Sequence, residues 1–416
     1  RLESGSYVSY RDGFDPARDA HIVSFEEQQR LWVRDNRLDI SEYRANAQDE
    51  GTVVTRLIES SRQANQQDPG LLKELLETLG LVAVSGKGIR YLSSGQVRRV
   101  LLARALYAWR EGVPQLLILD DPLESIDKES QQRIMVCIEQ FLHAGFSSLQ
   151  LCRRSNHIFP GVTHLAVMEQ LRILAKGERP KIELSVEFCR LQARKPKVPE
   201  QLPACLDQED TMIADNQPLI LLDGVDASYG DLRVLNNINW RMEADHHVLI
   251  EGPNGCGKST LLSLIDGENH KGYGQDVFLF GRRKGSGETV WEVKAHFGII
   301  SNELHNRYVK GWKVLDVLVS GFYDSIGLYD DSGAAEWIVA KEWLSALGIA
   351  ELERHYYHEI SFGQQRLVLL ARAMVKHPRL LVLDEPCVGL DDYYRELILG
   401  MLDLIAEQAN TQIVYV

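Results

Sequence analysis

The residues with the clearest chemical potential lie in the run E-G-P-N-G-C-G-K-S-T-L-L at positions 251–262. This run fits the pattern G-x-x-x-x-G-K-[ST], in which glycines turn backbone N–H groups toward phosphate oxygens, a lysine reaches the β and γ phosphates, and a hydroxyl binds Mg²⁺. The pattern therefore predicts a nucleotide-binding loop with Ser259 as a Mg²⁺ ligand. The predicted binding residues of this loop are Gly252, Pro253, Asn254, Gly255, Cys256, Gly257, Lys258, Ser259 and Thr260.

The residues on either side can position this loop. Residues 248–250 are apolar and predict a short buried strand that enters the loop, and Leu261 and Leu262 open a helix. The N-terminus of that helix would bring its positive dipole end to the phosphate site. The alternative is a chance glycine-rich turn, which would not require a strand before it and a helix after it.

A pair of carboxylates ends the apolar run L-L-V-L-D-E-P at positions 380–386. Four aliphatic residues in succession predict a central strand of a parallel sheet, and ligands bind at the carboxyl ends of such strands. We expect Asp384 to hold Mg²⁺, directly or through water, and Glu385 to orient or deprotonate an attacking water. A solvated acidic turn is the alternative for such a run by itself.

Between these two motifs lies I-S-F-G-Q-Q-R at positions 360–366, followed by an apolar helix. This run resembles the L-S-G-G-Q signature of ABC-type ATPases, with signature residues Ser361, Phe362, Gly363 and Gln364. The three motifs also stand in that family's order. The resemblance implies an α/β P-loop NTPase fold with a RecA-like core, ATP and Mg²⁺ as cofactors, and ATP hydrolysis. It also implies head-to-tail pairing of two domains, with each ATP between one phosphate loop and the other domain's signature.

The chain repeats two of these motifs. The run Y-L-S-S-G-Q-V-R-R at 91–99 and the run L-L-I-L-D-D-P at 116–122 copy the signature and the carboxylate strand. The copy is longer between its motifs, which predicts a loop extension at residues 108–113. We therefore expect two tandem ABC-type nucleotide-binding domains in one chain. The first copy supplies the signature residues Ser93, Ser94, Gly95 and Gln96 and the carboxylates Asp120 and Asp121.

The first copy has no phosphate loop, because nothing before Tyr91 fits the pattern. The sequence also ends before the position of the family's switch histidine, so we expect a fragment, with a natural chain that lost these parts as the alternative. The expected domains are an incomplete first domain at 1–170, a linker at 171–217, where prolines occur among mixed charges, and a second domain at 218–416. One composite site remains possible, with the Lys258 loop facing the Ser93–Gln96 signature.

Other residues take roles only through the family resemblance. Tyr229 would stack on adenine, with packing in an antiparallel sheet as the alternative. Asn302 stands where the family has the glutamine that contacts Mg²⁺ or the attacking water. In the first copy, Glu26 and Arg153 replace this glutamine and the switch histidine, and Asp121 is shorter than Glu385.

These departures predict one hydrolytic site and one site that mainly binds nucleotide. Phe362 occupies a position where the family usually has glycine. Its ring is expected to crowd the γ-phosphate of the weaker site.

Composition narrows the class of protein. The net charge of −13 and the pI of about 5.5 disfavour non-specific binding to nucleic acid or anionic membranes, so no nucleic-acid partner is expected. The mean hydropathy is −0.21, and no apolar run reaches the length of a membrane span. The six cysteines are scattered, which predicts a reducing compartment and no zinc site. We expect a cytoplasmic protein, free or bound peripherally at the inner membrane. Cys256 is either a small residue at a variable position or a reactive thiol.

A narrower resemblance rests on residues 278–294, residues 320–327 and the S-F-G-Q-Q-R signature. Together they are similar to the ModF group, also called photorepair protein PhrA, which are tandem ABC ATPases associated with molybdate uptake. This resemblance implies a role in molybdate transport or its regulation, through a separate membrane or regulatory partner. The alternatives are an ABC-F-type translation factor and the ATPase subunit of a transporter with separate membrane subunits. The proline-broken linker with balanced charge argues against the translation factor.

Overall fold

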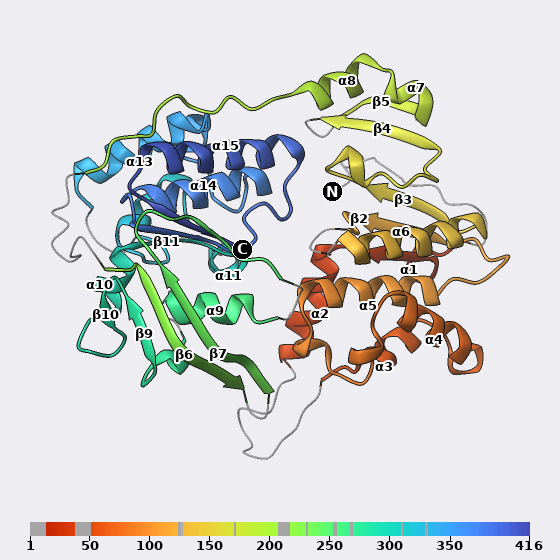
Figure 1. The fold of residues 1–416 in the computed structure, drawn as a ribbon. Helices are drawn as coiled ribbons and strands as arrows, with labels where there is room; N and C mark the ends of the chain where they lie inside the picture. The colour runs from red at the N-terminus through yellow and green to blue at the C-terminus, as the bar shows by residue number, and fades with distance from the viewer. Residues whose placement is uncertain are drawn as a thin grey trace. The chain divides into compact units, whose positions relative to one another are not determined.

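The computed structural model describes residues 14–37, 51–123, 126, 128–169, 172–206, 217–229, 232–252, 256–266, 269–308, 311–328 and 332–416. The chain divides into two compact units, Arg1–Ala193 and Arg194–Val416 (Figure 1), and each is described by itself. None of the helices in this described part combines the length and the apolar composition that a membrane crossing requires.

The core of the second unit is a parallel sheet with strand order β11-β12-β13-β8. Its strands are β8 (Val248–Leu249), β11 (Phe297–Ile300), β12 (Leu380–Leu383) and β13 (Gln412–Tyr415). In register, Ile300 pairs with Leu383, Leu383 with Tyr415, and Tyr415 with Leu249. The carboxyl ends of all four strands therefore lie along one edge of the sheet.

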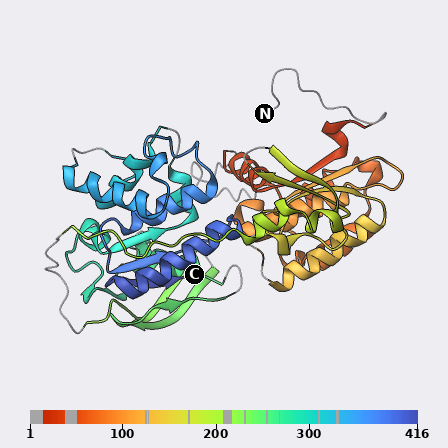
Figure 2. The same ribbon diagram turned by 90° about the horizontal axis from the view of Figure 1, so that it is seen from above.

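Alternation along β12 places this strand between two layers, because successive side chains point to opposite faces. Leu380 and Val382 pack with α9 (Lys258–Ile265), whereas Leu381 and Leu383 pack with α14 (Phe362–Met374) and α15 (Asp392–Gln408). Figure 1 shows α9 on one side of the sheet and α14 and α15 on the other, and in Figure 2 the dark blue α15 runs across it. All four residues of β12 are buried, as the apolar run predicted.

A second, antiparallel sheet packs against the other side of α9 and has the order β10-β9-β6-β7. Its strands are β6 (Ile220–Tyr229), β7 (Leu232–Met242), β9 (Asp276–Leu279) and β10 (Arg282–Arg283). The remaining helices of this unit are α10 (Val290–Ala295), α11 (Asn302–Arg307), α12 (Val314–Val319) and α13 (Ala334–Ala346). The fully buried Trp343 of α13 lies in the cluster that joins α12, α13 and α14.

A buried polar network holds residues 320–327, which carry part of the narrower resemblance. The Lys376 ammonium lies 2.5 Å from the Asp324 carboxylate and donates to the Lys294 carbonyl at 2.8 Å. Arg372 donates to the Tyr308 hydroxyl at 2.6 Å. These residues therefore join the segment to α10 and α14 and have a structural role.

The first unit repeats part of this plan. Its parallel sheet has the order β1-β2-β3, with β1 (Ala20–Val23), β2 (Leu116–Asp120) and β3 (Ser147–Leu151) in the places of β11, β12 and β13. Its helices are α1 (Pro16–Asp19), α2 (Phe25–Arg37), α3 (Val54–Glu59), α4 (Pro69–Thr78), α5 (Ser94–Tyr107) and α6 (Lys128–His143). Among the described residues of this unit, no strand takes the place that β8 has beside β13.

The expected linker differs from the structure in its first part. Residues 171–193 were expected to be linker, but β4 (His164–Glu169) and β5 (Arg172–Glu178) form a hairpin, followed by α7 (Arg179–Glu183) and α8 (Val186–Ala193). Pro180 lies in the first turn of α7, where a missing N–H costs nothing, so this proline begins a helix and does not mark a linker. The compact units divide after Ala193.

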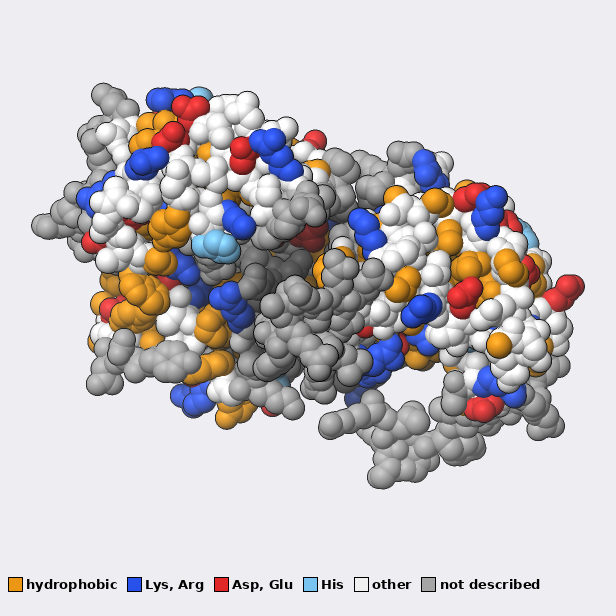
Figure 3. Space-filling model, turned by 90° about the horizontal axis from the view of Figure 1, so that it is seen from below, with side chains coloured by type: hydrophobic (Ala, Val, Ile, Leu, Met, Phe, Trp, Pro, Cys, Tyr) orange, Lys and Arg blue, Asp and Glu red, His pale blue; other side chains and the backbone are white. Residues whose placement is uncertain are grey.

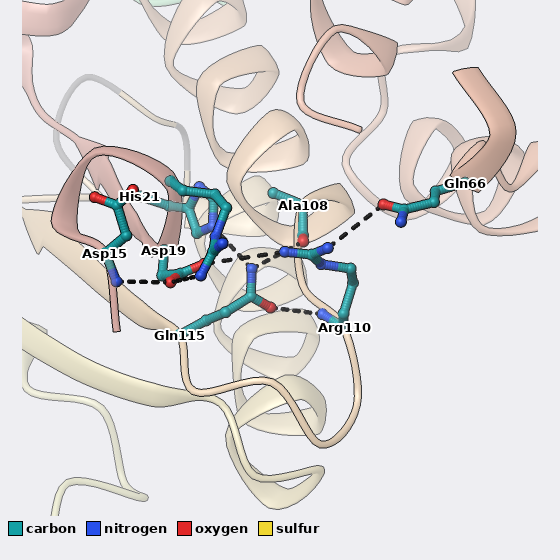
Figure 4. A network of polar contacts seen from close by, with 8 residues as sticks. Asp15, Asp19, His21, Gln66, Ala108, Arg110 and Gln115 are labelled. Atoms are coloured by element: carbon teal, nitrogen blue, oxygen red, sulfur yellow. Dashed lines mark hydrogen bonds and ion pairs between the residues drawn. The ribbon is translucent and has the colours of Figure 1, made fainter. Parts of the chain in front are cut away.

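Figure 4 shows a polar network at the amino ends of β1 and β2. Asp19 is fully buried and accepts two hydrogen bonds from the Arg18 guanidinium, which lower the pKa of Asp19 to about 2. The Arg110 backbone N–H donates to Gln115 at 2.6 Å, and the Gln115 amide donates to the Ala108 carbonyl at 3.1 Å. These bonds anchor the extension predicted at residues 108–113. The network lies at the opposite end of the strands from the carboxylates that follow β2.

The face drawn in Figure 3 carries charges of both signs among apolar side chains. Within each unit, the visible Lys and Arg side chains of the described residues are scattered and do not form a continuous stripe on this face. A basic stripe is the surface that nucleic-acid backbones require.

Candidate nucleotide-binding site

The phosphate loop and the carboxylate pair of the second unit emerge at the same sheet edge. Beyond β8, the Ile250 N–H donates to the Tyr415 carbonyl at 2.8 Å. Beyond β12, the Asp384 N–H donates to the Ile300 carbonyl at 2.9 Å, and the Glu385 N–H donates to the Val416 carbonyl at 3.1 Å. Only β13 separates β8 from β12, so the fold brings together the two motifs that the sequence pairs.

The described part of the phosphate loop has the backbone that the pattern requires. Gly257 lies at φ +101°, and a Cβ there would come within 2.9 Å of Leu235, so only glycine fits. Lys258 begins α9 directly after Gly257, and its ammonium donates to the Gly252 carbonyl at 2.7 Å. Ser259 and Thr260 follow in the first turn of α9, and Cys256 is exposed. Pro253, Asn254 and Gly255 lie outside the described residues.

The carboxylate pair has perturbed proton affinities. Burial raises the pKa of Asp384, and Lys258 and Arg366 oppose this shift. Burial also raises the pKa of Glu385, and the neighbouring charge of Asp384 raises it further. Glu385 lies at φ +49°, a left-handed conformation that costs about 1–3 kcal/mol for a residue with a side chain and is typical of functional sites. A half-buried carboxylate with a raised pKa is suited to accept a proton from water.

The signature residues cap their helices. The Ser361 hydroxyl accepts from the Gln364 N–H at 3.3 Å, and the Gln364 side chain accepts from the Ser361 N–H at 2.9 Å. Ser93 and Gln96 form the same capping box on α5, at 3.3 and 3.0 Å. Both signatures are therefore rigid helix starts. The side chain of Ser94 lies outside what the structure describes.

Two glycines accompany these capped helix starts. Gly363 packs on Tyr394, because a Cβ on this glycine would lie 2.2 Å from the tyrosine ring. Gly95 is buried.

The ring of Phe362 is directed into its own unit. It lies edge-on to His305 with ring centroids 5.1 Å apart, and the Arg366 guanidinium lies 5.1 Å from its centroid. Gly389 is its third neighbour, since a Cβ there would meet the ring at 2.4 Å. The ring packs in the helical layer, and its predicted crowding of a γ-phosphate at the weaker site stays a prediction.

His305 connects the end of β11 to the signature helix. It lies on α11, bonds the Tyr357 hydroxyl at 3.0 Å, and contacts Phe362. Burial and the Arg366 charge lower the pKa of His305 to about 4, so the imidazole is neutral near pH 7. Asn302 begins the same helix after the cap residue Ser301, as its strand-end position predicted.

Two candidate side chains lie outside the described atoms. The structure places Asn302 and Tyr229 by their backbones and does not describe their side chains. Tyr229 ends β6, opposite Leu232 of β7.

In the first unit, the carboxylate pair lies at the end of β2, where Asp120 is the last strand residue and Asp121 follows it with a backbone geometry similar to that of Glu385. Asp121 lies at φ +42°, comparable with +49° for Glu385. Burial and the charge of Asp121 raise the pKa of Asp120. The Arg153 guanidinium lies 3.0 Å from one Asp121 oxygen, and the Arg153 N–H donates to the other at 3.1 Å. The second carboxylate of this copy is therefore held in an ion pair.

The comparisons with known proteins agree with this geometry. A model of the ABC transporter family matches residues 235–388. The ABC transporter ATP-binding protein ModF of Escherichia coli is 34% identical over 406 residues, which cover 95% of this chain and 80% of that protein. The chain belongs to the ABC ATPases of the ModF group. Members of this family bind and hydrolyse ATP, and this chain is an ATPase.

Other relatives support the fold. An uncharacterized ABC transporter ATP-binding protein of Schizosaccharomyces pombe is 27% identical over 306 residues, which cover 73% of this chain and 60% of that protein. The solved structure of an archaeal ribosome recycling factor, aABCE1, in complex with the ribosomal stalk protein aP1, is similar over 88% of this chain and 65% of that chain. Its TM-score is 0.51 and its sequence identity 18%, so it shows the fold alone. The predicted α/β P-loop fold is confirmed.

Sequence reasoning missed the buried arginine that each ABC signature helix places near the carboxylates. Arg366 is 1% exposed and lowers the pKa values of Asp384 and Glu385 against the effect of burial. Arg98 donates to the Asp121 carbonyl at 2.6 Å. The repeat contained the signal, because Arg98 and Arg366 stand at the same distance after Ser93 and Ser361.

Proposed function

We propose that this ABC ATPase hydrolyses ATP at one site, built on the second unit. Lys258, Thr260 and the loop amides hold the phosphates, and Glu385 accepts the proton of the attacking water. Ser259 and Asp384 hold Mg²⁺, because a hydroxyl and a carboxylate are the hard oxygen donors that this ion prefers. Bound Mg²⁺ would neutralise charge on the phosphate oxygens. Asn302 assists in orienting the water, and Tyr229 stacks on adenine.

The observation that carries this proposal is the difference between the two carboxylate pairs. Glu385 has a pKa raised by burial and by Asp384, whereas Asp121 is shorter and is ion-paired to Arg153. The Arg153 guanidinium occupies one side of the Asp121 carboxylate, and this side chain is one methylene shorter than that of Glu385, so Asp121 is less suitably placed to contact an attacking water. The first unit's pair therefore supports nucleotide binding more than hydrolysis.

The signature of the first unit, Ser93, Ser94, Gly95 and Gln96, is proposed to complete the Lys258 site by intramolecular pairing of the two domains. The support is the family pattern together with the capping box that prepares the helix start. The signature of the second unit, Ser361, Phe362, Gly363 and Gln364, would face the weaker site.

The experiment is steady-state ATP hydrolysis by the full chain and two single variants. Glu385→Gln is expected to lower kcat by about a hundredfold or more, the usual contribution of a general base. Asp121→Asn is the matched carboxylate-to-amide change and is expected to alter kcat less than about twofold, well below that contribution. Equal losses in the two variants would contradict the single-site proposal.

The physiological role is proposed to be molybdate transport or its regulation, through a separate membrane or regulatory partner. The support is the ModF-group resemblance and the 34% identity to the Escherichia coli protein. The Glu385→Gln variant, held in its ATP-bound form, should capture that partner from cells of the source organism. Capture that is the same with and without ATP would argue against a partner that senses the ATP-bound state.

A further inference from the structure

A pocket in the second unit lies outside the nucleotide site. It opens between the β9–β10 hairpin and α10 and has a volume of about 610 Å³, including the space at its mouth. Its walls include Leu279, Phe280, Val290, Val293 and His296, with Arg282 beside them. Neither the described residues of the phosphate loop nor Asp384 and Glu385 line it. Mainly apolar walls with a few polar groups are typical of small-molecule sites.

One wall is held by an unusual turn. Phe280 and Gly281 form the two-residue connection of the hairpin, with φ of +50° and +78°. Such turns favour Asn, Asp or Gly, and a phenylalanine there is strained. Its ring is 6% exposed and packs 5.0 Å from the His296 ring and 5.1 Å from the Phe297 ring. The turn therefore holds the Phe280 ring against His296 and Phe297 as one wall of the pocket.

The floor of the pocket is the stem of Lys284. Its ammonium donates to the carbonyls of Asn269 at 2.9 Å and Leu264 at 3.3 Å, near the C-terminus of α9. It lies 5.2 Å from the centroid of the Tyr273 ring, which also lines the pocket. The Lys284 ammonium is thus hydrogen-bonded to backbone oxygens, and the methylene groups of this side chain can form an apolar floor.

The two acidic side chains that line the pocket already accept hydrogen bonds from the backbone. The Glu288 carboxylate accepts from the N–H groups of Gly285 and Ser286, at 2.5 and 2.9 Å, and Glu292 accepts from the Thr289 N–H at 2.9 Å. Both carboxylates are therefore already compensated by backbone donors.

Arg282 places a positive charge beside the pocket. Within the described part of the chain, Arg282 is exposed and makes no ion pair, whereas its neighbour Arg283 pairs with Asp276 at 2.9 Å. The pocket thus combines an apolar interior with one available guanidinium.

We propose that this pocket binds a small organic anion with a flat apolar body, whose acidic group pairs with Arg282. The body would lie between Phe280 and Val293, above the Lys284 stem. An inorganic oxyanion fits less well, because such ions need several converging donors and the walls here are mainly apolar. The pocket is also joined to the nucleotide site at two places, since Lys284 bonds the Leu264 carbonyl near the end of the phosphate-loop helix α9 and His296 leads into β11.

The test uses 2-naphthoate as the probe, titrated by calorimetry into the full chain with a saturating non-hydrolysable ATP analogue present. Binding with a Kd below about 1 mM is expected, in the range of a small fragment. Arg282→Gln should weaken it about tenfold, the usual contribution of a charge-assisted hydrogen bond. The matched change Arg283→Gln should alter the Kd less than about twofold, as for a surface pair outside the pocket.

Two further measurements separate this pocket from other surfaces. Val290→Trp, at an exposed position of the mouth, should abolish binding by filling it, and unchanged thermal unfolding would show that the variant is folded. The uncharged 2-naphthalenemethanol should bind about tenfold more weakly than 2-naphthoate. Absence of binding below about 1 mM, or equal effects of the two arginine changes, would each overturn the proposal.

Discussion

The half-buried His305 makes the stability of the protein depend on pH in a predictable way. Burial and Arg366 lower its pKa to about 4 from the ordinary value of 6.5. Between pH 6.5 and 4 the unfolded chain therefore binds more protons at this residue than the folded chain does. The stability that neutral His305 supports is fully present above pH 6.5 and is lost as the pH falls toward 4.

The size of this loss follows from the two pKa values. The free energy of unfolding should decrease by about 2 kcal/mol when the pH falls from 7.5 to 5, and by about 3 kcal/mol when it falls below 4. For a domain of about 200 residues, 2 kcal/mol corresponds to a decrease in Tm of roughly 4–8 °C.

The assay is thermal unfolding of the full chain at pH 7.5 and 5, followed by circular dichroism. His305→Gln keeps a side chain that can bond Tyr357 but cannot be protonated, so most of the extra Tm decrease should disappear in this variant. His358→Gln, at an exposed position, is the matched control and should behave as the unaltered protein does. If His305→Gln and the unaltered chain lose the same Tm between the two pH values, the reasoning about burial is wrong.

Three further changes test contacts around the site. Gly257→Ala should abolish binding of an ATP analogue and lower the free energy of unfolding by about 1–3 kcal/mol. Gly287→Ala is the control, because Gly287 also has a positive φ but has no atom within 4 Å of its Cβ, and this variant should still bind the analogue. Comparable affinities for the two variants would refute the Leu235 contact. Gly389→Ala should lower the Tm because the new Cβ meets the Phe362 ring. Adding Phe362→Leu to this variant should restore part of the lost Tm. No restoration would mean that backbone strain alone lowers the Tm. Lys376→Met leaves Asp324 buried without its cation and should cost about 3–5 kcal/mol in denaturant unfolding, and the double variant with Asp324→Asn should recover part of it. A double variant as unstable as the single one would show that the ion pair is not the cause.

The sequence predicted those parts of the protein whose chemistry is local. The phosphate loop, the carboxylate pair and the two signatures are short runs in which the residue types themselves determine backbone geometry and function. The strand L-L-V-L was predictable because four consecutive aliphatic residues favour a buried parallel strand. The tandem organisation followed from the repeat of these runs.

The linker prediction failed because proline has more than one structural use. The prolines of residues 171–217 predicted a linker, but Pro180 lies in the first turn of a helix, where proline is favourable. Its role depends on the hairpin that precedes it, which pairs residues 164–169 with 172–178. No pattern within the expected linker contains that information.

By itself, the sequence determined which residues could bind phosphate and carry out hydrolysis, because these motifs are continuous in the chain. Only the tertiary structure decided how the remaining side chains act on them. Phe362 packs in its own unit because His305 and Gly389, distant in sequence, lie beside it together with Arg366 of the next helical turn. Asp121 is ion-paired because β3 delivers Arg153 beside the end of β2. Burial and charge depend on neighbours in space, and the folded chain supplies those neighbours from segments that no local motif connects.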